Sequence, residues 1–197
     1  MPSMTRRKLW CGAGLLSAAL LSLLFVATLQ TLAHRPQAIK RVQAWWRGAE
    51  YLGSERVIFQ RSSYDCAVAC LRMVLRERGI EADGQTVAAL AGTTARGTSM
   101  LGIRKAAEHF GVTAAAWKIA PEDLANTPRP FIALLDESHF VVVTEVTTNN
   151  ELILLDPAMG RLKYPAVVFL RQWAGQAVLF GEKATPAVSR SHPVSNR

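Results

Sequence analysis

Cysteine is scarce in this sequence: its 197 residues include three, Cys11, Cys66 and Cys70. Cys11 lies in a hydrophobic N-terminal run. Cys66 and Cys70 are four residues apart, and on one helix that spacing holds two Cβ atoms farther apart than a disulfide normally allows. No pairing of Cys-x-x-Cys units of the zinc-binding type occurs. We therefore expect no disulfide framework, no metal site and no cofactor.

The central part of the chain has no excess charge of either sign. The formal net charge is +8, but residues 51–181 contain 13 basic and 13 acidic side chains, so the basic excess lies in the two ends. Basic residues beside a hydrophobic segment are typical of attraction to anionic lipid. No nucleic-acid-binding motif accompanies them, so we expect no nucleic-acid partner. Half of the residues are hydrophobic, which predicts one packed domain with an accessory segment.

A long uncharged run occupies residues 9–29, after Arg6, Arg7 and Lys8. At about 1.5 Å per residue a helix of this length crosses the roughly 30 Å core of a bilayer. The length favours a retained transmembrane helix, and the alternative is a signal peptide cleaved near Thr31-Leu32-Ala33. We assign residues 1–35 to this anchor or signal segment.

The orientation of such an anchor follows from its flanking charges. Basic residues stand on both sides, so the positive-inside rule nearly cancels. A short basic N-terminus on a single anchor usually stays in the cytoplasm. This predicts a single-pass protein of the bacterial inner membrane, with its folded domain on the extracytoplasmic side.

Two further segments flank the expected domain. Residues 36–55 have the character of a juxtamembrane stalk, in which Trp45 and Trp46 suit either a membrane interface or packing on the domain. Residues 184–197 are polar with two prolines and predict a disordered tail. The domain itself is expected over residues 56–183.

The pattern of that domain changes from helical to extended along the chain. Apolar residues at helical spacing predict a helix over residues 66–78, a second over 85–91, and a third from Gly97-Thr98-Ser99 to about Phe110. Short β-branched runs then predict strands over residues 113–118, 131–135, 140–146 and 151–155. A further strand, a helix over 167–173 and a last strand over 177–180 follow. Helices followed by an antiparallel sheet indicate an α+β fold.

Cys66 is the candidate nucleophile of the chain. It begins a helix directly after Asp65, a suitable N-cap residue, and the positive end of a helix dipole favours the thiolate form of cysteine. Position alone also fits a buried structural cysteine. Cys70, one turn further along the apolar face, is interpreted as structural.

A cysteine nucleophile needs a base, an orienting acceptor and donors for an oxyanion. Among the four histidines, His139 stands at the entry to a strand, whereas His109 at a helix end is interpreted as structural. Asp156 ends the strand expected to pair with that of His139 across the Asn149-Asn150 turn, and paired strands lie about 4.8 Å apart. Gln60 precedes Cys66 by six residues, where its amide and the Cys66 N–H would serve the oxyanion.

The ordered motifs of the chain resemble those of the double-glycine leader peptidases, the bacteriocin-processing cysteine peptidase domains that are often fused to peptide-exporting ABC transporters. The resemblance covers residues 56–181. Its matching pieces are Gln60-x4-Asp65-Cys66-x2-Ala69-Cys70-Leu71-x-Met73, Gly97-Thr98-Ser99 through Phe110-Gly111, Pro130-Phe131-Ile132-Ala133, Ser138-His139-Phe140-Val141-Val142, Asp156-Pro157-Ala158-x-Gly160 and Phe169-x3-Trp173-x-Gly175.

The resemblance implies a papain-like fold, with Cys66 as nucleophile, His139 as base, Asp156 as its partner and Gln60 as oxyanion donor. It also implies cleavage after Gly-Gly in a leader peptide and a possible link to an export transporter. Ala67 departs from the glycine that usually follows the cysteine in the family. No transporter domains follow in this sequence, so two alternatives stay open: a non-catalytic docking module for leader peptides, and a cysteine peptidase or amidase with another envelope substrate.

Overall fold

The computed structural model describes residues 20–28, 30, 36–181 and 192–193, and the chain divides into two units at Val42/Gln43. In the first unit, residues 20–28 and 30 are helical, and the side chains of the apolar residues among 20–26 are exposed. No helix among the residues described is both long and apolar enough to cross a membrane. Most of the expected anchor, residues 9–29, lies outside the described residues.

The second unit contains a single antiparallel sheet. Its strands are β1 (Glu50–Gly53), β2 (Ala114–Lys118), β3 (Phe131–Leu135), β4 (His139–Val146), β5 (Glu151–Asp156), β6 (Gly160–Pro165), β7 (Trp173–Phe180) and β8 (His192–Pro193). Their order in the sheet is β1-β6-β5-β4-β3-β7-β2-β8, and every neighbouring pair is antiparallel. The helices are α2 (Pro36–Trp46), α3 (Cys66–Glu77), α4 (Gly84–Leu90), α5 (Met100–His109) and α6 (Ala166–Gln172), with the 3-10 helix η1 (Pro121–Asn126).

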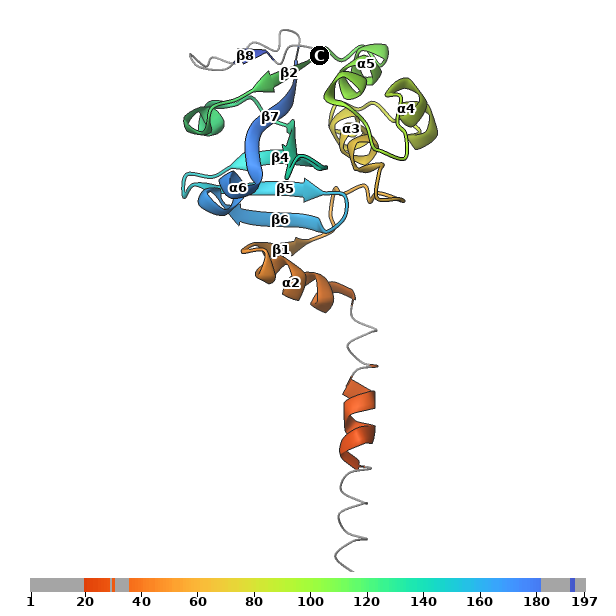
Figure 1. Cartoon of the computed structure of the whole chain (residues 1–197), viewed down its shortest axis with the longest axis vertical. Coiled ribbons are helices and arrows are strands. Elements are labelled where there is room, and N and C mark those ends of the chain that lie inside the picture. Colours follow the sequence, from red (N-terminus) through yellow and green to blue (C-terminus); the bar gives the residue numbers. More distant parts are fainter. Residues whose placement is uncertain (1–19, 29, 31–35, 182–191, 194–197) are drawn as a thin grey trace, which may run out of the picture. The chain divides into compact units, whose positions relative to one another are not determined.

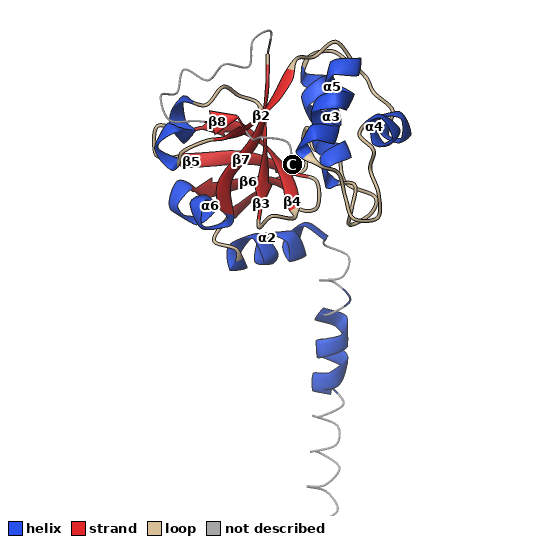
Figure 2. Cartoon of the chain, turned by 45° about the horizontal axis from the view of Figure 1, so that its top comes forward, coloured by secondary structure: helices blue, strands red, loops and turns tan. Residues whose placement is uncertain are grey.

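Successive side chains of a strand point to opposite faces of the sheet, so the hydrophobic core has two layers. In β4, Phe140 and Val142 pack in a cluster with α3, α4 and α5, whereas Val141 and Val143 pack in a second cluster with α6. Figure 1 shows α3, α4 and α5 gathered beside one another, and Figure 2 shows the red strands between these helices and α6. The predicted α+β arrangement, helices first and then an antiparallel sheet, is confirmed.

The segment expected to be a stalk, residues 36–55, contains α2 and β1. Ala44 and Ala49 are buried in the second core cluster, and β1 pairs with β6. Residues 43–53 therefore belong to the folded unit. The expected tail, residues 184–197, lies outside the described residues except for β8, which pairs with β2.

Candidate active site

Cys66 begins α3 and is buried, with 4% of its surface exposed. Asp65 stands at the N-cap position but caps no helical N–H. Its carboxylate instead accepts hydrogen bonds from the N–H groups of Arg61 (3.1 Å) and Ser62 (2.9 Å). The capping role predicted for Asp65 is wrong, because these closer upstream N–H groups occupy its oxygens. Asp65 shapes the loop that leads to Cys66.

His139 and Asp156 meet at one edge of the β4–β5 pair. His139 is the first residue of β4, Asp156 is the last of β5, and His139 Nε2 lies 3.0 Å from Asp156 Oδ1. The register that brings them together pairs Val142 with Leu155. It is maintained by a turn at the predicted position, in which Asn150 has a positive φ of 60° and donates its N–H to the Thr147 carbonyl.

The carboxylate of Asp156 is buried but well supplied with donors. Oδ1 also accepts hydrogen bonds from the N–H groups of Ala158 (2.7 Å) and Met159 (3.1 Å). Burial raises the pKa of Asp156, but the hydrogen bond and charge of His139 and the two backbone donors outweigh it, so the pKa is lowered. Asp156 is therefore an anion that fixes the His139 ring through Nε2.

His139 also interacts with Cys66. Burial raises the pKa of Cys66, but a hydrogen bond with the His139 side chain, the Phe140 N–H, the charge of His139 and the Ala67 N–H lower it to below its ordinary value. Burial lowers the pKa of His139, and hydrogen bonds and charges from Asp156 and Cys66 raise it to about 9. A thiolate–imidazolium pair is the form that these shifts favour near neutral pH. With Nε2 on Asp156, Nδ1 is the nitrogen left for Cys66.

Phe140 connects both cysteines of α3 to β4. The pairing of β4 with β5 begins at Val142, so at Phe140 the strand has β3 on one side and α3 nearby. The Phe140 carbonyl accepts a hydrogen bond from Cys70 Sγ at 3.2 Å, and its N–H faces Cys66. Burial raises the pKa of Cys70 well above its ordinary value, and this fully buried thiol is a donor, in agreement with its predicted structural role.

Gln60 makes hydrogen bonds to the loop before α3 and to the residue after β5. Its backbone N–H donates to the Pro157 carbonyl at 2.9 Å, which places it next to the end of β5. Its side-chain Nε2 donates to the Ser62 carbonyl at 2.9 Å, and its Oε1 is buried without a partner. Its role as oxyanion donor stays a prediction.

A cleft of about 480 Å³ adjoins Cys66. One wall is formed by residues 95–100. This segment includes most of a tight turn that is closed by a bridge between Thr94 and Gly97, and Gly97 has a φ of +97°. Ser99 ends this wall by capping α5 through a hydrogen bond from Gly102 N–H at 3.0 Å. The opposite wall includes Leu134, Ser138 and Phe140. The cleft has space for an extended peptide against the thiol.

One feature near the centre was missed from the sequence. Arg47, within the expected stalk, lines a second pocket that also contains His139 and Asp156. No signal in the sequence places Arg47 there, because the pairing of β1 with β6 joins segments more than a hundred residues apart. His109, interpreted as structural, lies against the Phe110 ring at 5.5 Å between centroids.

The structure brings together a helix-borne cysteine, a strand-borne histidine and an aspartate, which is the set of groups that nucleophilic catalysis by cysteine requires. Residues 54–185 match the model of the Peptidase C39 family, and the chain belongs to that family.

Named relatives agree with this membership. An uncharacterised protein of Methanothermobacter marburgensis is 35% identical over 129 residues, which are 66% of this chain and 90% of that protein. The lactococcin-G-processing and transport ATP-binding protein LagD of Lactococcus lactis is 34% identical over 149 residues. That match covers 72% of this chain and 21% of LagD, so this chain is similar to a small part of the transporter.

Solved structures show the same domain. A double-glycine-motif protease from an AMS/PCAT transporter, crystallised with its leader peptide, superposes with a TM-score of 0.61 at 30% identity, over 63% of this chain and 89% of that one. The peptidase domain of the Streptococcus ABC transporter ComA gives a TM-score of 0.59 at 26% identity, over 64% and 98%.

Proposed function

We propose that this protein is a cysteine endopeptidase that cleaves the peptide bond after a Gly-Gly pair in the leader of a secreted peptide. The observation that carries the chemistry is the arrangement of Cys66, His139 and Asp156, with the His139–Asp156 contact at 3.0 Å and the pKa of the thiol lowered. Membership of the C39 family and similarity to a leader-bound protease support the class of substrate.

The mechanism follows from the positions of the three groups. The Cys66 thiolate attacks the carbonyl carbon, and the new oxyanion is stabilised by the Cys66 N–H and the Gln60 amide. His139 gives its proton to the leaving nitrogen, the C–N bond breaks, and a thioester forms on Cys66. His139 then accepts a proton from water, whose oxygen attacks the thioester and releases the leader as an acid. Asp156 holds the ring throughout.

The test is cleavage of a defined peptide mixture by the full chain under reducing conditions. Peptides with Gly-Gly junctions are mixed with matched Ala-Ala peptides, and mass spectrometry locates the cuts. We expect cuts after Gly-Gly that disappear in Cys66→Ala and His139→Ala but persist in His109→Ala, a histidine outside the site. Cuts elsewhere that depend on Cys66 would overturn the leader specificity. A folded wild-type chain that cuts nothing would support a docking role instead.

We also propose that residues 9–29 attach the protein to the bacterial inner membrane, with the peptidase domain outside the cytoplasm. The uncharged run and its flanking basic residues support this placement. Protease added to intact spheroplasts tests it, because an extracytoplasmic domain is digested from outside. Protection of the domain until the membrane is opened would contradict the proposal.

A further inference from the structure

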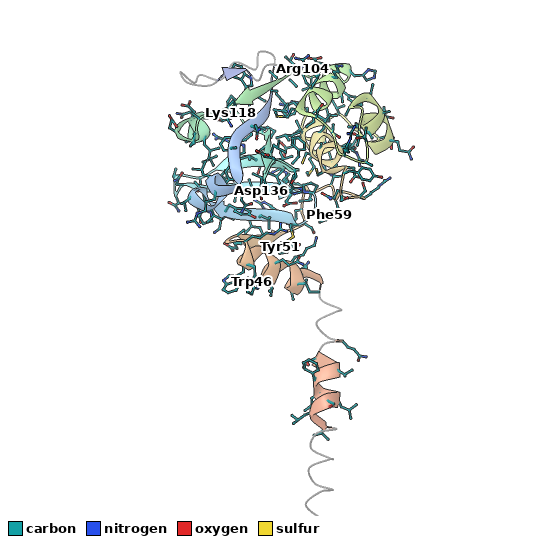
Figure 3. The ribbon with its side chains drawn as sticks, in the orientation of Figure 1. Trp46, Tyr51, Phe59, Arg104, Lys118 and Asp136 are labelled. Carbon is teal, nitrogen blue, oxygen red and sulfur yellow. The ribbon has the colours of Figure 1, made fainter. Side chains whose placement is uncertain are left out.

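A second pocket of about 390 Å³ opens beside His139 and Asp156. Its polar lining includes Arg47, Asp136, Tyr164 and Gln172. Ser138 lines both this pocket and the cleft beside Cys66, so the two hollows adjoin. Figure 3 labels Asp136, on the loop before β4, and Trp46, which directly precedes Arg47. We name this hollow the Arg47 pocket.

If the proposed peptidase function holds, the reaction determines which side of the cleaved bond faces the Arg47 pocket. Cys66 bonds to the carbonyl side of the cleaved peptide, so residues before the cut occupy the cleft that Cys66 lines. His139 protonates the nitrogen of the leaving side. Residues after the cut therefore lie toward the pocket that contains His139 but not Cys66.

The backbone that carries Arg47 is firmly held. Its N–H donates to the Ala44 carbonyl at 3.0 Å, and Ala49 N–H donates to the same carbonyl at 2.9 Å. Ala44 and Ala49 are buried, and the next residues form β1 against β6. Arg47 precedes residue 54, where the family match begins. It therefore lies outside the segment that matches the family model.

The charge of Arg47 is available to a ligand. Within the part of the chain that the structure describes, no carboxylate lies in an ion pair with it. Burial and the charge of Asp156 raise the pKa of the Tyr164 hydroxyl, and Arg47 partly offsets them, which places the guanidinium near that hydroxyl. Asp156 is already engaged by His139 and two backbone donors. Asp136 is the opposing charge left in the pocket.

We propose that Arg47 binds an acidic side chain in the first two residues after the cleaved bond and so selects substrates on their leaving side. A guanidinium presents paired N–H donors that match a carboxylate, and the Tyr164 hydroxyl and Gln172 amide are further donors at the same pocket. Asp136, the opposing charge in the same pocket, weakens this preference.

The experiment compares full-length variants on peptides that differ only at those two positions, where they carry Asp, Asn or Lys. We expect wild type to have a kcat/KM about fivefold higher for Asp than for Asn, as one partly exposed charge pair allows. Arg47→Gln should remove that difference, Arg47→Glu should favour Lys, and Asp136→Asn should increase the preference for Asp. Arg171→Gln, which removes an exposed arginine on α6, is the matched control. An Asp-to-Asn ratio that is the same in wild type and Arg47→Gln would overturn the inference.

A binding measurement separates this inference from the proposed function. The same peptides are titrated into Cys66→Ala and into Cys66→Ala combined with Arg47→Gln, with fluorescence anisotropy as the readout. Weaker binding of the Asp peptide alone in the double variant supports the Arg47 pocket even if no cleavage is found. Equal binding of Asp and Asn peptides to Cys66→Ala rules the pocket out, whatever the cleavage assay gives.

Discussion

The two buried cysteines of α3 have opposite protonation preferences because of what faces them. Cys66 meets a cationic ring and two N–H groups, which favour its thiolate. Cys70 meets the Phe140 carbonyl, an acceptor that requires the thiol to keep its proton. Both interactions involve the backbone at Phe140, directly after His139. We infer that Cys70 keeps the start of β4 in position for the catalytic pair.

Two substitutions of Cys70 distinguish the loss of its hydrogen-bond donor from the loss of its packing. Cys70→Ala leaves the buried Phe140 carbonyl without this donor, at a cost of about 1–3 kcal/mol in stability, and should slow alkylation of Cys66 near neutral pH. Cys70→Ser keeps a donor and should restore most of the alkylation rate. Val74→Ala, one turn further along the buried face, is the control for lost packing. Equal alkylation rates in Cys70→Ala and wild type, each still folded, would contradict the positioning role.

The pH dependence of cleavage follows from the same residues. The rate requires Cys66 without its proton and His139 with its proton. As pH rises through the lowered pKa of Cys66, kcat/KM should rise, and as pH rises further through the pKa of His139, about 9, it should fall. A profile of kcat/KM against pH checks both limbs. A kcat/KM that keeps rising at pH values above the pKa of His139 would show that His139 is not the proton donor.

At the scale of elements, the β5–β6 turn connects Asp156 to the edge of the sheet. Asp156 pairs with Gly160, and the Asp156 carboxylate accepts from the N–H groups within the turn. Gly160 has a φ of +126° and approaches β1 closely. A Cβ at this position would lie 2.6 Å from the Gly53 carbonyl oxygen and 2.8 Å from the Tyr51 ring. The turn thus depends on a glycine for both conformation and space.

Gly160→Ala should therefore destabilise the fold by about 2 kcal/mol or more, because strain and a backbone clash add. It should also lower cleavage by displacing Asp156. Gly111→Ala is the control: its φ is +75°, but a Cβ there meets nothing within 4 Å, so strain alone of about 1 kcal/mol is expected. Denaturant unfolding of both variants measures the difference. Equal losses would show that contact with β1 does not constrain the turn.

Most elements were predictable because their signals are local. Helical spacing predicted α3 within one residue at its end, and runs bounded by turn residues predicted β3 and β5 closely. β1 was not predicted, since Glu50–Gly53 has no alternating pattern and gains its place from a distant partner, β6. The meeting of His139 with Asp156 followed from one turn. The side-chain direction of Gln60 depends on the Ser62 carbonyl, a contact that no spacing reveals.

At the scale of the whole molecule, the folded unit extends beyond the segment that matches the family model, at its N-terminal side. The compact unit begins at Gln43, whereas the family match begins at residue 54. The intervening residues bury Ala44 and Ala49, add β1 to the sheet and bring Glu50 to within 2.7 Å of Lys163. Within these residues, β1 pairs with the outer edge of β6.

A fragment that begins at Gln43 should therefore be more stable than one that begins at Ser54. Loss of the edge strand and its buried alanines is expected to lower Tm by about 5 °C or more, since about 1 kcal/mol shifts Tm by 2–4 °C in a domain of this size. Thermal unfolding followed by circular dichroism compares the two fragments. Identical Tm values would show that residues 43–53 add nothing to the unit.

The hairpin of β4 and β5 forms the His139–Asp156 contact from residues that are near neighbours in the chain, whereas Cys66 reaches it only when α3 packs on the sheet. An unfolded or newly made chain therefore carries an ordinary, weakly reactive thiol. The lowering of the Cys66 pKa requires the packing of α3 on the sheet, because His139 and Phe140 belong to β4. The lowered pKa of Cys66 is thus a property of the correctly packed domain, and a misassembled copy would not have it.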